Sequence, residues 1–432
     1  MLQLFTNGSL SALLASTALL LGACADTPET TPEPISRTPV AEQPALPATP
    51  PQPIPGTPSA AQLTFETWRS AFRDQALAKG IDAALFEKSF AGITPDPSII
   101  RADGAQPEFT RPVWEYLDGA ISPTRLRRGQ ALLAEHAATL SAIEQRYGVN
   151  RETLVAIWGM ESSFGQFMGE HSVIRSLATL AYAGRRPQFA EAQLLAALQI
   201  LQSGDISLRG LRGSWAGAMG QTQFIPTTYL SHAVDFDGDG RRDIWNSSAD
   251  ALASAAHYLQ ASGWQQDRAW GIQVSLPSGF DYALADSEIR KTYAQWHSLG
   301  VKGTPTHVDP NDTGYLLLPA GHRGPAFLVF RNFGAILRYN NSTSYALAVG
   351  LLAQRLQGAP PLQANWPKDE RPLGRSERIA LQEALNAKGY SAGPADGIIG
   401  ANTRRAVRAF QQSQGLPADG YPTPALLQQL RY

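Results

Sequence analysis

A single carboxylate, Glu161, stands where an apolar helical segment gives way to small and aromatic residues, over positions 157–165. The helix predicted just before it covers 150–160, with Asn150 as its N-cap and with Leu154 and Trp158 on its buried side. A glutamate against such a surface is poorly solvated, so we expect its pKa to be raised and its carboxyl to act as a general acid. Considered alone, a glutamate at a helix end is more often a solvated or ion-paired residue.

A second group of carboxylates lies in one acidic loop, residues 235–246. Oxygen ligands fall at loop positions 1, 3, 5 and 9, a glycine at position 6 and a main-chain carbonyl at position 7, which is the spacing of an EF-hand. These positions are Asp235, Asp237, Asp239 and Asp243, with the carbonyl of Arg241. Position 12 is Asn246 instead of a bidentate glutamate, so calcium coordination is expected to be weaker or incomplete. An Asp/Gly turn that matches by chance is the competing interpretation.

Neutral hydrogen-bonding side chains form a third group. Ser214 and Gln223 lie in a stretch rich in glycine and alanine, residues 213–226, where a backbone can approach a ligand closely. Their hydroxyl and amide groups can form neutral hydrogen bonds with N-acetyl and hydroxyl groups of a ligand. Tyr339 and Asn340 follow later in the chain. The alternatives are a tight helix-packing segment for the first pair and a simple turn for the second.

Arg185 and Arg186 are adjacent and precede a predicted helix. Two guanidinium groups can bind carboxylates through paired hydrogen bonds, so this pair is a candidate for anionic parts of a ligand. A solvated loop between helices is a serious competing interpretation of the same residues.

Composition excludes several classes of function. The 432 residues predict roughly three domain-sized units. The formal net charge of -1 argues against a nucleic-acid partner, because such partners require a basic surface. One cysteine cannot form a disulfide framework or a thiolate zinc site. The chain contains no Walker loop and no dinucleotide-binding fingerprint, so we expect no organic cofactor.

The lone cysteine, Cys24, follows an apolar run over residues 10–22 that is short for a membrane span and typical of a signal peptide. The sequence Leu21-Gly22-Ala23-Cys24 resembles the lipobox of bacterial lipoproteins, in which the cysteine is lipidated. We therefore predict a signal peptide over 1–23 and a lipid anchor, with an ordinary cleavage site as the alternative. Residues 1–9 depart from the pattern, since they contain no Lys or Arg. Residues 24–60 are rich in proline and predict an extended tether.

Hydrophobic periodicity predicts a mainly helical unit with a small sheet over 61–358. Helices are expected at 125–147, where Gly148 ends the helix, and at 150–160, 188–203, 248–262, 287–299 and 345–356. Two shorter helices are expected within 63–90, and strands near 272–276, 315–318 and 326–330. A linker rich in proline and glycine follows at 359–374. Three short helices, at 376–389, 402–414 and 423–430, then predict a terminal module over 375–432.

With these elements placed, residues 63–358 resemble the membrane-bound lytic murein transglycosylase B family, whose catalytic domain is lysozyme-like. The resemblance is carried by the segments 158–165, 213–226, 233–240 and 338–340, in that order. The terminal module resembles the three-helix peptidoglycan-binding domain of cell-wall enzymes, through the Asp396-Gly397 turn, Thr403 and residues 407–411.

The resemblance implies a lytic transglycosylase that cleaves the bond between N-acetylmuramic acid and N-acetylglucosamine and leaves 1,6-anhydro ends. It implies Glu161 as the catalytic acid and base, contact of Ser214 and Gln223 with the acetamido group, and closure of the site by Tyr339 and Asn340. It also shifts the interpretation of Arg185-Arg186 toward substrate binding, and that of the acidic loop toward a structural calcium ion.

The expected partners are peptidoglycan strands and, through the lipid anchor, a membrane. Ala25 follows the cysteine where an inner-membrane protein would have an aspartate, so the resemblance suggests the outer membrane. We expect the protein to lie in the periplasm and to be a monomer. Two alternatives stay open. A muramidase would hydrolyse the same bond with water and a second carboxylate, and a wall-binding lipoprotein would be catalytically silent.

Overall fold

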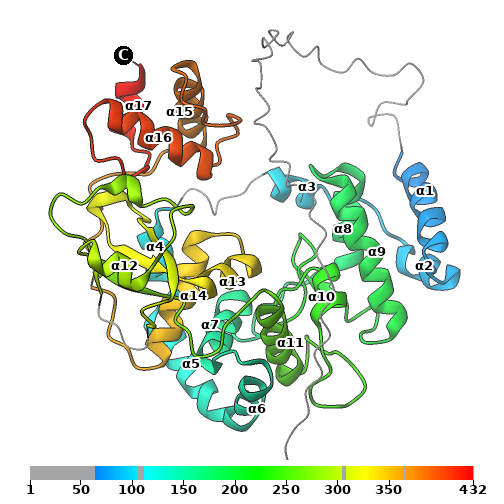
Figure 1. The fold of residues 1–432 in the computed structure, drawn as a ribbon. Coiled ribbons are helices and arrows are strands. Elements are labelled where there is room, and N and C mark those ends of the chain that lie inside the picture. The colour runs from blue at the N-terminus through cyan, green and yellow to red at the C-terminus, as the bar shows by residue number, and fades with distance from the viewer. Residues whose placement is uncertain (1–63, 105–110, 304–307, 364, 432) are drawn as a thin grey trace, which may run out of the picture. The chain divides into compact units, whose positions relative to one another are not determined.

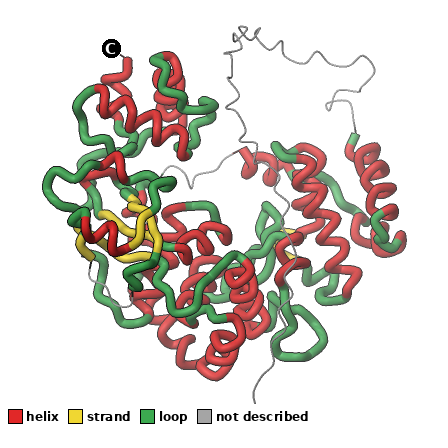
Figure 2. Tube along the Cα trace, viewed as in Figure 1, coloured by secondary structure: helices red, strands yellow, loops and turns green. Residues whose placement is uncertain are grey.

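Residues 64–104, 111–303, 308–363 and 365–431 are described by the structure, a computed structural model dominated by helices (Figures 1 and 2). The mainly helical class with a small sheet is confirmed. The predicted signal peptide, the tether and Cys24 lie outside the described residues. Among the helices that the structure describes, none has the length and apolar character needed to cross a membrane.

The helix that carries Glu161 shares one hydrophobic core with six other helices that the structure describes. The group consists of α4 (Val113–Ala120), α5 (Pro123–Glu135), α6 (Ala137–Tyr147), α7 (Arg151–Ser162), α11 (Ser248–Ala261), α13 (Arg331–Tyr339) and α14 (Thr343–Leu356). The single helix predicted over 125–147 is wrong, because His136 leaves helical geometry at φ -101° and separates α5 from α6. The break lets α5 pack on α7 and α14 while α6 packs on α11. Gly148 ends α6 in a left-handed conformation, as expected.

A second core is formed by α1 (Phe65–Ala78), α2 (Ala83–Phe90), α8 (Val173–Ala183), α9 (Pro187–Ser203) and α10 (Pro226–His232). Helix α3 (Pro97–Gly104) packs on α8. A short antiparallel pair, β1 (His171–Ser172) and β2 (Arg212–Gly213), joins the chain after α7 to the glycine-rich stretch before α10. This pairing positions residues 213–226 beside the end of the Glu161 helix.

The small sheet is antiparallel throughout, with strand order β4-β6-β7-β3-β5. Its strands are β3 (Gly271–Ser275), β4 (Lys291–Thr292), β5 (Lys302–Gly303), β6 (Thr313–Leu317) and β7 (Ala326–Val329), with 3-10 turns η3 (Tyr282–Leu284) and η4 (Gly321–Arg323). The helix predicted over 287–299 is wrong in its first half: only α12 (Tyr293–Ser298) forms. Lys291 pairs with Gly314 in the sheet instead, and Thr292 then caps α12 through a capping box with Gln295.

The terminal module contains α15 (Arg375–Ala387), α16 (Ala401–Ser413) and α17 (Pro424–Arg431) around a core of its own. Gln382 is buried and ties the Asp396-Gly397 turn to Thr403 through hydrogen bonds. The Arg408 side chain extends beyond the module and donates a 2.6 Å hydrogen bond to Asp286. The three expected helices are thus present.

Candidate active site and acidic loop

Glu161 lies in the last turn of α7 and is half-buried. The helix ends abruptly, because Ser163 and Phe164 both have positive φ values, 48° and 63°. Gly159 permits this turn, since a Cβ there would meet the Phe164 ring at 2.7 Å. Ser162 secures it by donating to the carbonyl of Gln221 at 2.7 Å and by accepting the amide of Gly165 at 2.9 Å. The backbone around Glu161 is therefore held by short contacts.

A tyrosine hydroxyl contacts the Glu161 carboxylate directly. Tyr345, at the start of α14, donates a 2.5 Å hydrogen bond to Oε1 of Glu161. Burial raises the pKa of Tyr345 well above its usual value, and the nearby charge of Glu161 raises it further. Burial and then the charge of Glu161 likewise raise the pKa of Tyr339. Both phenols thus remain protonated donors next to the carboxyl group.

The glycine-rich stretch reaches this site through its residues 221–223. Tyr339 donates a 2.8 Å hydrogen bond to the carbonyl of Thr222, and Ser162 contacts Gln221 as described. Gln223 has a positive φ of 51°, and its side-chain amide donates to the carbonyls of Met168 at 3.1 Å and Gly220 at 2.9 Å. The structure therefore brings the 221–223 segment to the end of α7 through Gln221 and to Tyr339 through Thr222.

Ser214 has a local role in shaping its loop. Its hydroxyl accepts the amides of Ala216 at 3.2 Å and Ala218 at 3.0 Å. The adjacent backbone is crowded, because a Cβ on Gly169 would meet the carbonyl oxygen of Gly213 at 2.2 Å. Ser214 remains partly exposed, so it can reach a ligand while it holds the turn.

The other predicted substrate-binding residues, Asn340, Arg185 and Arg186, are exposed to solvent. Asn340 is exposed directly after α13. Arg185 pairs with Asp103 of α3 through its main-chain amide at 2.9 Å and its guanidinium at 3.2 Å. Arg186 is stacked over the Phe189 ring at 4.3 Å. Both arginines are exposed at the turn between α8 and α9.

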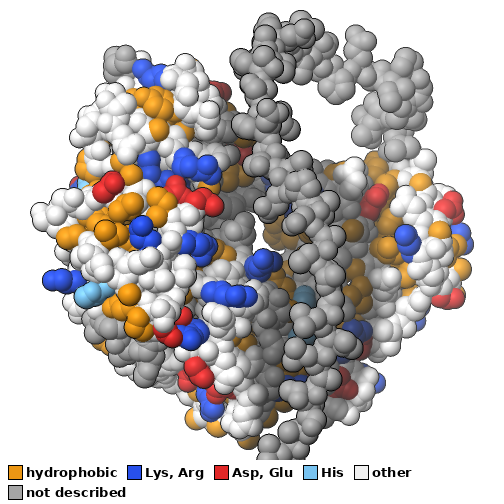
Figure 3. All heavy atoms as spheres, in the orientation of Figure 1, with side chains coloured by type: hydrophobic (Ala, Val, Ile, Leu, Met, Phe, Trp, Pro, Cys, Tyr) orange, Lys and Arg blue, Asp and Glu red, His pale blue; other side chains and the backbone are white. Residues whose placement is uncertain are grey.

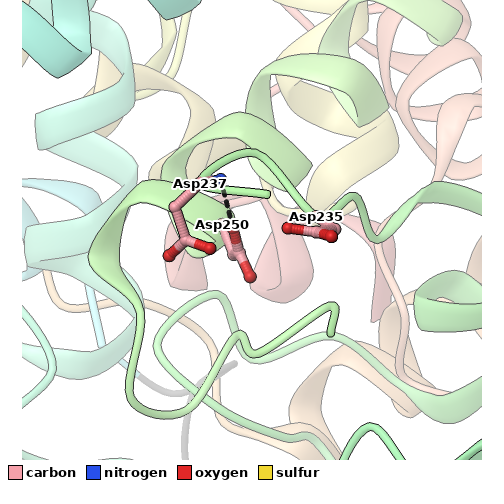
Figure 4. A group of neighbouring side chains, drawn as sticks. All are labelled: Asp235, Asp237 and Asp250. Carbon is pink, nitrogen blue, oxygen red and sulfur yellow. Dashed lines mark hydrogen bonds between the residues drawn. The ribbon is translucent and has the colours of Figure 1, made fainter. Parts of the chain in front are cut away.

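Three carboxylates gather at the acidic loop: Asp235, Asp237 and Asp250, with oxygen atoms within 4.8 Å of one another (Figure 4). Asp250 comes from α11, beyond the loop, and is fully buried. Its carboxylate accepts the amides of Phe236 at 2.8 Å, Asp237 at 3.3 Å and Asp243 at 2.8 Å. Burial raises the pKa of Asp250, since these hydrogen bonds offset only part of the lost solvation.

The remaining predicted metal ligands are arranged differently. Asp239 accepts the amide of Arg241 at 2.9 Å, and Asp243 accepts the amides of Trp245 and Asn246 at 3.0 and 2.9 Å. Neither Asp239 nor Asp243 belongs to the group of three carboxylates whose oxygen atoms lie within 4.8 Å of one another. Calcium favours six to eight oxygen ligands. The clustered carboxylates are the right donor type for it, and the burial of Asp250 leaves a charge that a cation would compensate.

Comparisons with known proteins match these two parts of the chain. A family model described as the transglycosylase SLT domain matches residues 64–354, and a peptidoglycan binding domain model matches 374–430. The chain belongs to the SLT transglycosylase family. It is 32% identical to membrane-bound lytic murein transglycosylase B of Escherichia coli K12 over 240 residues, which cover 54% of this chain and 64% of that protein.

Solved members of the SLT transglycosylase family share the fold. SltB3 of Pseudomonas aeruginosa, in complex with NAG-anhNAM-pentapeptide, is 60% identical with a TM-score of 0.83; the match covers 85% of this chain and all of that one. The lytic transglycosylase Slt35 of Escherichia coli, in complex with calcium, is 28% identical with a TM-score of 0.59, and the match covers 67% of this chain and 92% of that one.

Two residues at these sites were missed by the sequence reasoning. Tyr345 falls within a predicted helix, where its aromatic side chain has the periodicity of a core residue. Asp250 lies four residues after Asn246, outside the twelve-residue loop of an EF-hand. The sequence does contain a signal for Asp250, because an aspartate on the buried face of an otherwise apolar helix requires a partner. For Tyr345 the sequence offered no signal, because its partner Glu161 is 184 residues away.

Proposed function

We propose that this SLT family member is a lytic transglycosylase that cleaves the β-1,4 bond between N-acetylmuramic acid and N-acetylglucosamine in peptidoglycan. The observation that carries the proposal is the half-buried Glu161 carboxyl group, oriented by the Tyr345 hydroxyl at 2.5 Å. In the first step, protonated Glu161 gives its proton to the glycosidic oxygen, and the bond to C1 of the muramyl residue breaks. The substrate's acetamido group stabilises the oxocarbenium-like centre.

In the second step the Glu161 carboxylate takes the proton from the muramyl C6 hydroxyl, whose oxygen then closes on C1. Water is not consumed, so a single carboxyl group serves as acid and then as base. Tyr345 supports this cycle because a phenol that stays protonated can hydrogen-bond to either form of the glutamate. Its neutral donor group holds the carboxyl in place without adding a second ionised group at the reacting bond.

Substrate-binding roles are proposed for six residues. Gln223 is supported by its place two residues after Gln221, whose carbonyl accepts the Ser162 hydroxyl at the end of α7. Tyr339 is supported by its hydrogen bond to Thr222, and Ser214 by its partial exposure. Asn340 is assigned to closing the site beside Tyr339. Arg185 and Arg186 are assigned to carboxylates of the murein strand, and the Arg185–Asp103 pair leaves guanidinium donors on an exposed side chain.

A structural calcium site is proposed at the acidic loop, and the calcium complex of Slt35 supports it. Asp235, Asp237 and Asp250 would hold the ion, with Asp239, Asp243 and the carbonyl of Arg241 as the ligands expected from spacing. The loop joins α10 to α11, and Gln221 is tied to it through the carbonyls of Ile244 and Trp245. A cation would therefore brace the segment that carries Gln223.

The wider organisation is proposed from the sequence. Lipidation of Cys24 would anchor the mature chain to the outer membrane, facing the periplasm. Residues 24–60 would serve as a tether, 61–358 as the catalytic unit and 359–374 as a linker. The module 375–432 would bind the same peptidoglycan strands, and the protein would work as a monomer without nucleic acid or an organic cofactor. Peptide-bearing substrate is supported by the SltB3 complexes with pentapeptide muropeptides.

Mass spectrometry of the products tests the reaction. Purified murein digested with this protein should release muropeptides with anhydro ends, which are lighter by one water than hydrolysed ends. Hydrolysed ends in their place would establish the alternative muramidase reaction. A zymogram on purified murein that shows no clearing would instead favour a silent wall-binding protein.

A further inference from the structure

A cavity of about 580 Å³ lies along one face of α13, within the size range of small-molecule sites. Arg331, Gly334 and Arg338 line it from that helix, at a spacing that places them on one side. Arg290, Asp312 and Tyr315 line it from the sheet and its connections. The residues assigned above to the reaction do not line this cavity.

The cavity walls carry an excess of positive charge. Asp312 is already paired with Arg268, at 3.2 Å, and Arg268 also pairs with Asp309 at 2.8 Å. Arg290 lies over the Tyr315 ring at 5.1 Å. Among the residues that the structure describes, neither Arg290 nor Arg338 pairs with a carboxylate. Figure 3 shows Lys and Arg side chains gathered on the face where Figure 1 labels α12 and α13.

Buried hydrogen bonds preorganise these walls. Asn332 is fully buried and accepts the amide of Gln265 at 2.7 Å, while its side-chain amide donates to the carbonyls of Gln265 and Arg268 at 2.8 Å each. Arg331 donates to the carbonyl of Gly263 at 3.1 Å. The loop after α11 is thereby fastened to the first turn of α13, so the arginines are presented by a rigid frame.

Helix α13 connects the cavity with the site of Glu161, because Arg338 lines the cavity and the next residue, Tyr339, is close enough to feel the charge of Glu161. Arg338 directly precedes Tyr339, and its carbonyl accepts the Tyr258 hydroxyl at 2.6 Å. The rings of Tyr258 and Tyr339 contact each other with centroids 5.2 Å apart. Ser262, which lines the cavity, follows Tyr258 by about one helical turn. A ligand held at Glu161 could therefore extend a side branch toward these arginines.

We propose that this cavity binds carboxylate groups of the peptide stem of peptidoglycan, an inference that rests on the proposed function. A glycan backbone presents mainly neutral hydroxyl and acetamido groups, which need no cluster of guanidinium groups. Arginine is instead suited to carboxylates, which it binds through paired charge-assisted hydrogen bonds. Arg338 and Arg290 provide those donors, and the absence of a side chain on Gly334 leaves room for the peptide.

Equilibrium binding to the full chain tests the site without turnover. Every variant is made in a Glu161→Gln background, and calorimetry compares NAG-NAM-pentapeptide with peptide-free NAG-NAM. Arg338→Gln should weaken the pentapeptide probe about tenfold or more, the loss expected for a charge-assisted hydrogen bond. Peptide-free NAG-NAM should change less than about twofold. Arg209→Gln, an exposed arginine elsewhere in the chain, is the matched control.

Gly334→Glu provides a second, independent variant. A Cβ at Gly334 meets open space and its φ is not positive, so the substitution fits the helix and adds a negative charge to the cavity. It should also weaken the pentapeptide probe selectively. Gly119→Glu is the control, because Gly119 is likewise helical and open. Unchanged probe ratios in both cavity variants, or equal losses on both probes, would overturn the proposal. Product analysis with the wild-type protein reports separately on the reaction itself.

Discussion

Two regions of this protein use carboxylates in contrasting surroundings. Glu161 is one half-buried carboxyl group beside the tyrosine hydroxyls of α13 and α14. At the acidic loop, Asp235, Asp237 and Asp250 stand close together and accept main-chain amides. A neutral phenol donor suits a carboxyl group that must gain and lose a proton. Clustering of carboxylates suits a cation, which relieves their mutual repulsion.

The difference shows that residue type does not assign the role of a carboxylate. A phenol can donate to Glu161 in both protonation states of the reaction, whereas amides at the loop orient oxygen atoms permanently. Four experiments test this contrast, beginning with the one for which we expect the greatest change.

Glu161→Gln should lower release of anhydromuropeptides from murein by about 10³-fold, within the usual range for a general acid–base group. The amide cannot supply the proton, yet it has the same shape and can still accept the Tyr345 hydroxyl. Melting temperature should therefore stay near that of the wild type. Release at the wild-type rate would show that Glu161 is not the catalytic acid and base, and the contrast between the two regions would then be wrong.

Tyr345→Phe should lower kcat about 10- to 100-fold, since a hydrogen bond to a charged group contributes about 1.5–3 kcal/mol. The lost donor favoured the ionised carboxylate, so the alkaline limb of the pH–rate profile should move to higher pH. A profile with an unchanged alkaline limb would mean that Tyr345 acts only in packing.

Calcium should raise the melting temperature of the wild-type protein, and a chelator should reverse the rise. Saturation at about 100 times Kd corresponds to about 2.7 kcal/mol of stabilisation. Asp250→Asn should remove most of this response, while Asp239→Asn should keep more of it, because only Asp250 belongs to the clustered carboxylates. The opposite order would favour the ligands expected from sequence spacing.

Ser214→Ala should have the smallest effect, about tenfold or less on kcat/KM. Its hydroxyl accepts two main-chain amides, and their loss should also cost about 1–3 kcal/mol of folding stability. Parallel measurements of thermal unfolding and steady-state kinetics separate the two contributions. A large kinetic loss with unchanged stability would give Ser214 a role in the reaction beyond shaping its loop.

Much of the fold followed from hydrophobic periodicity. The helix before Glu161, the two helices at 188–203 and 248–262 and the three principal strands lie within a few residues of their predicted bounds. Errors arose where tertiary contacts outweigh local pattern. His136 interrupts one predicted helix so that its halves can pack on different neighbours. Residues 291–292 join the sheet although their sequence continues a helical pattern.

Local chemistry was already readable in the sequence: a glutamate at the end of an apolar helical segment, and an aspartate-rich loop with glycines at its turns. Such features depend on spacing over a few residues, so they are visible without coordinates. The distant groups that complete these sites became visible only in the folded chain. Tyr345 reaches Glu161, and Asp250 enters the acidic loop, because packing of α14 on α7 and of α11 on its neighbours brings separated segments together.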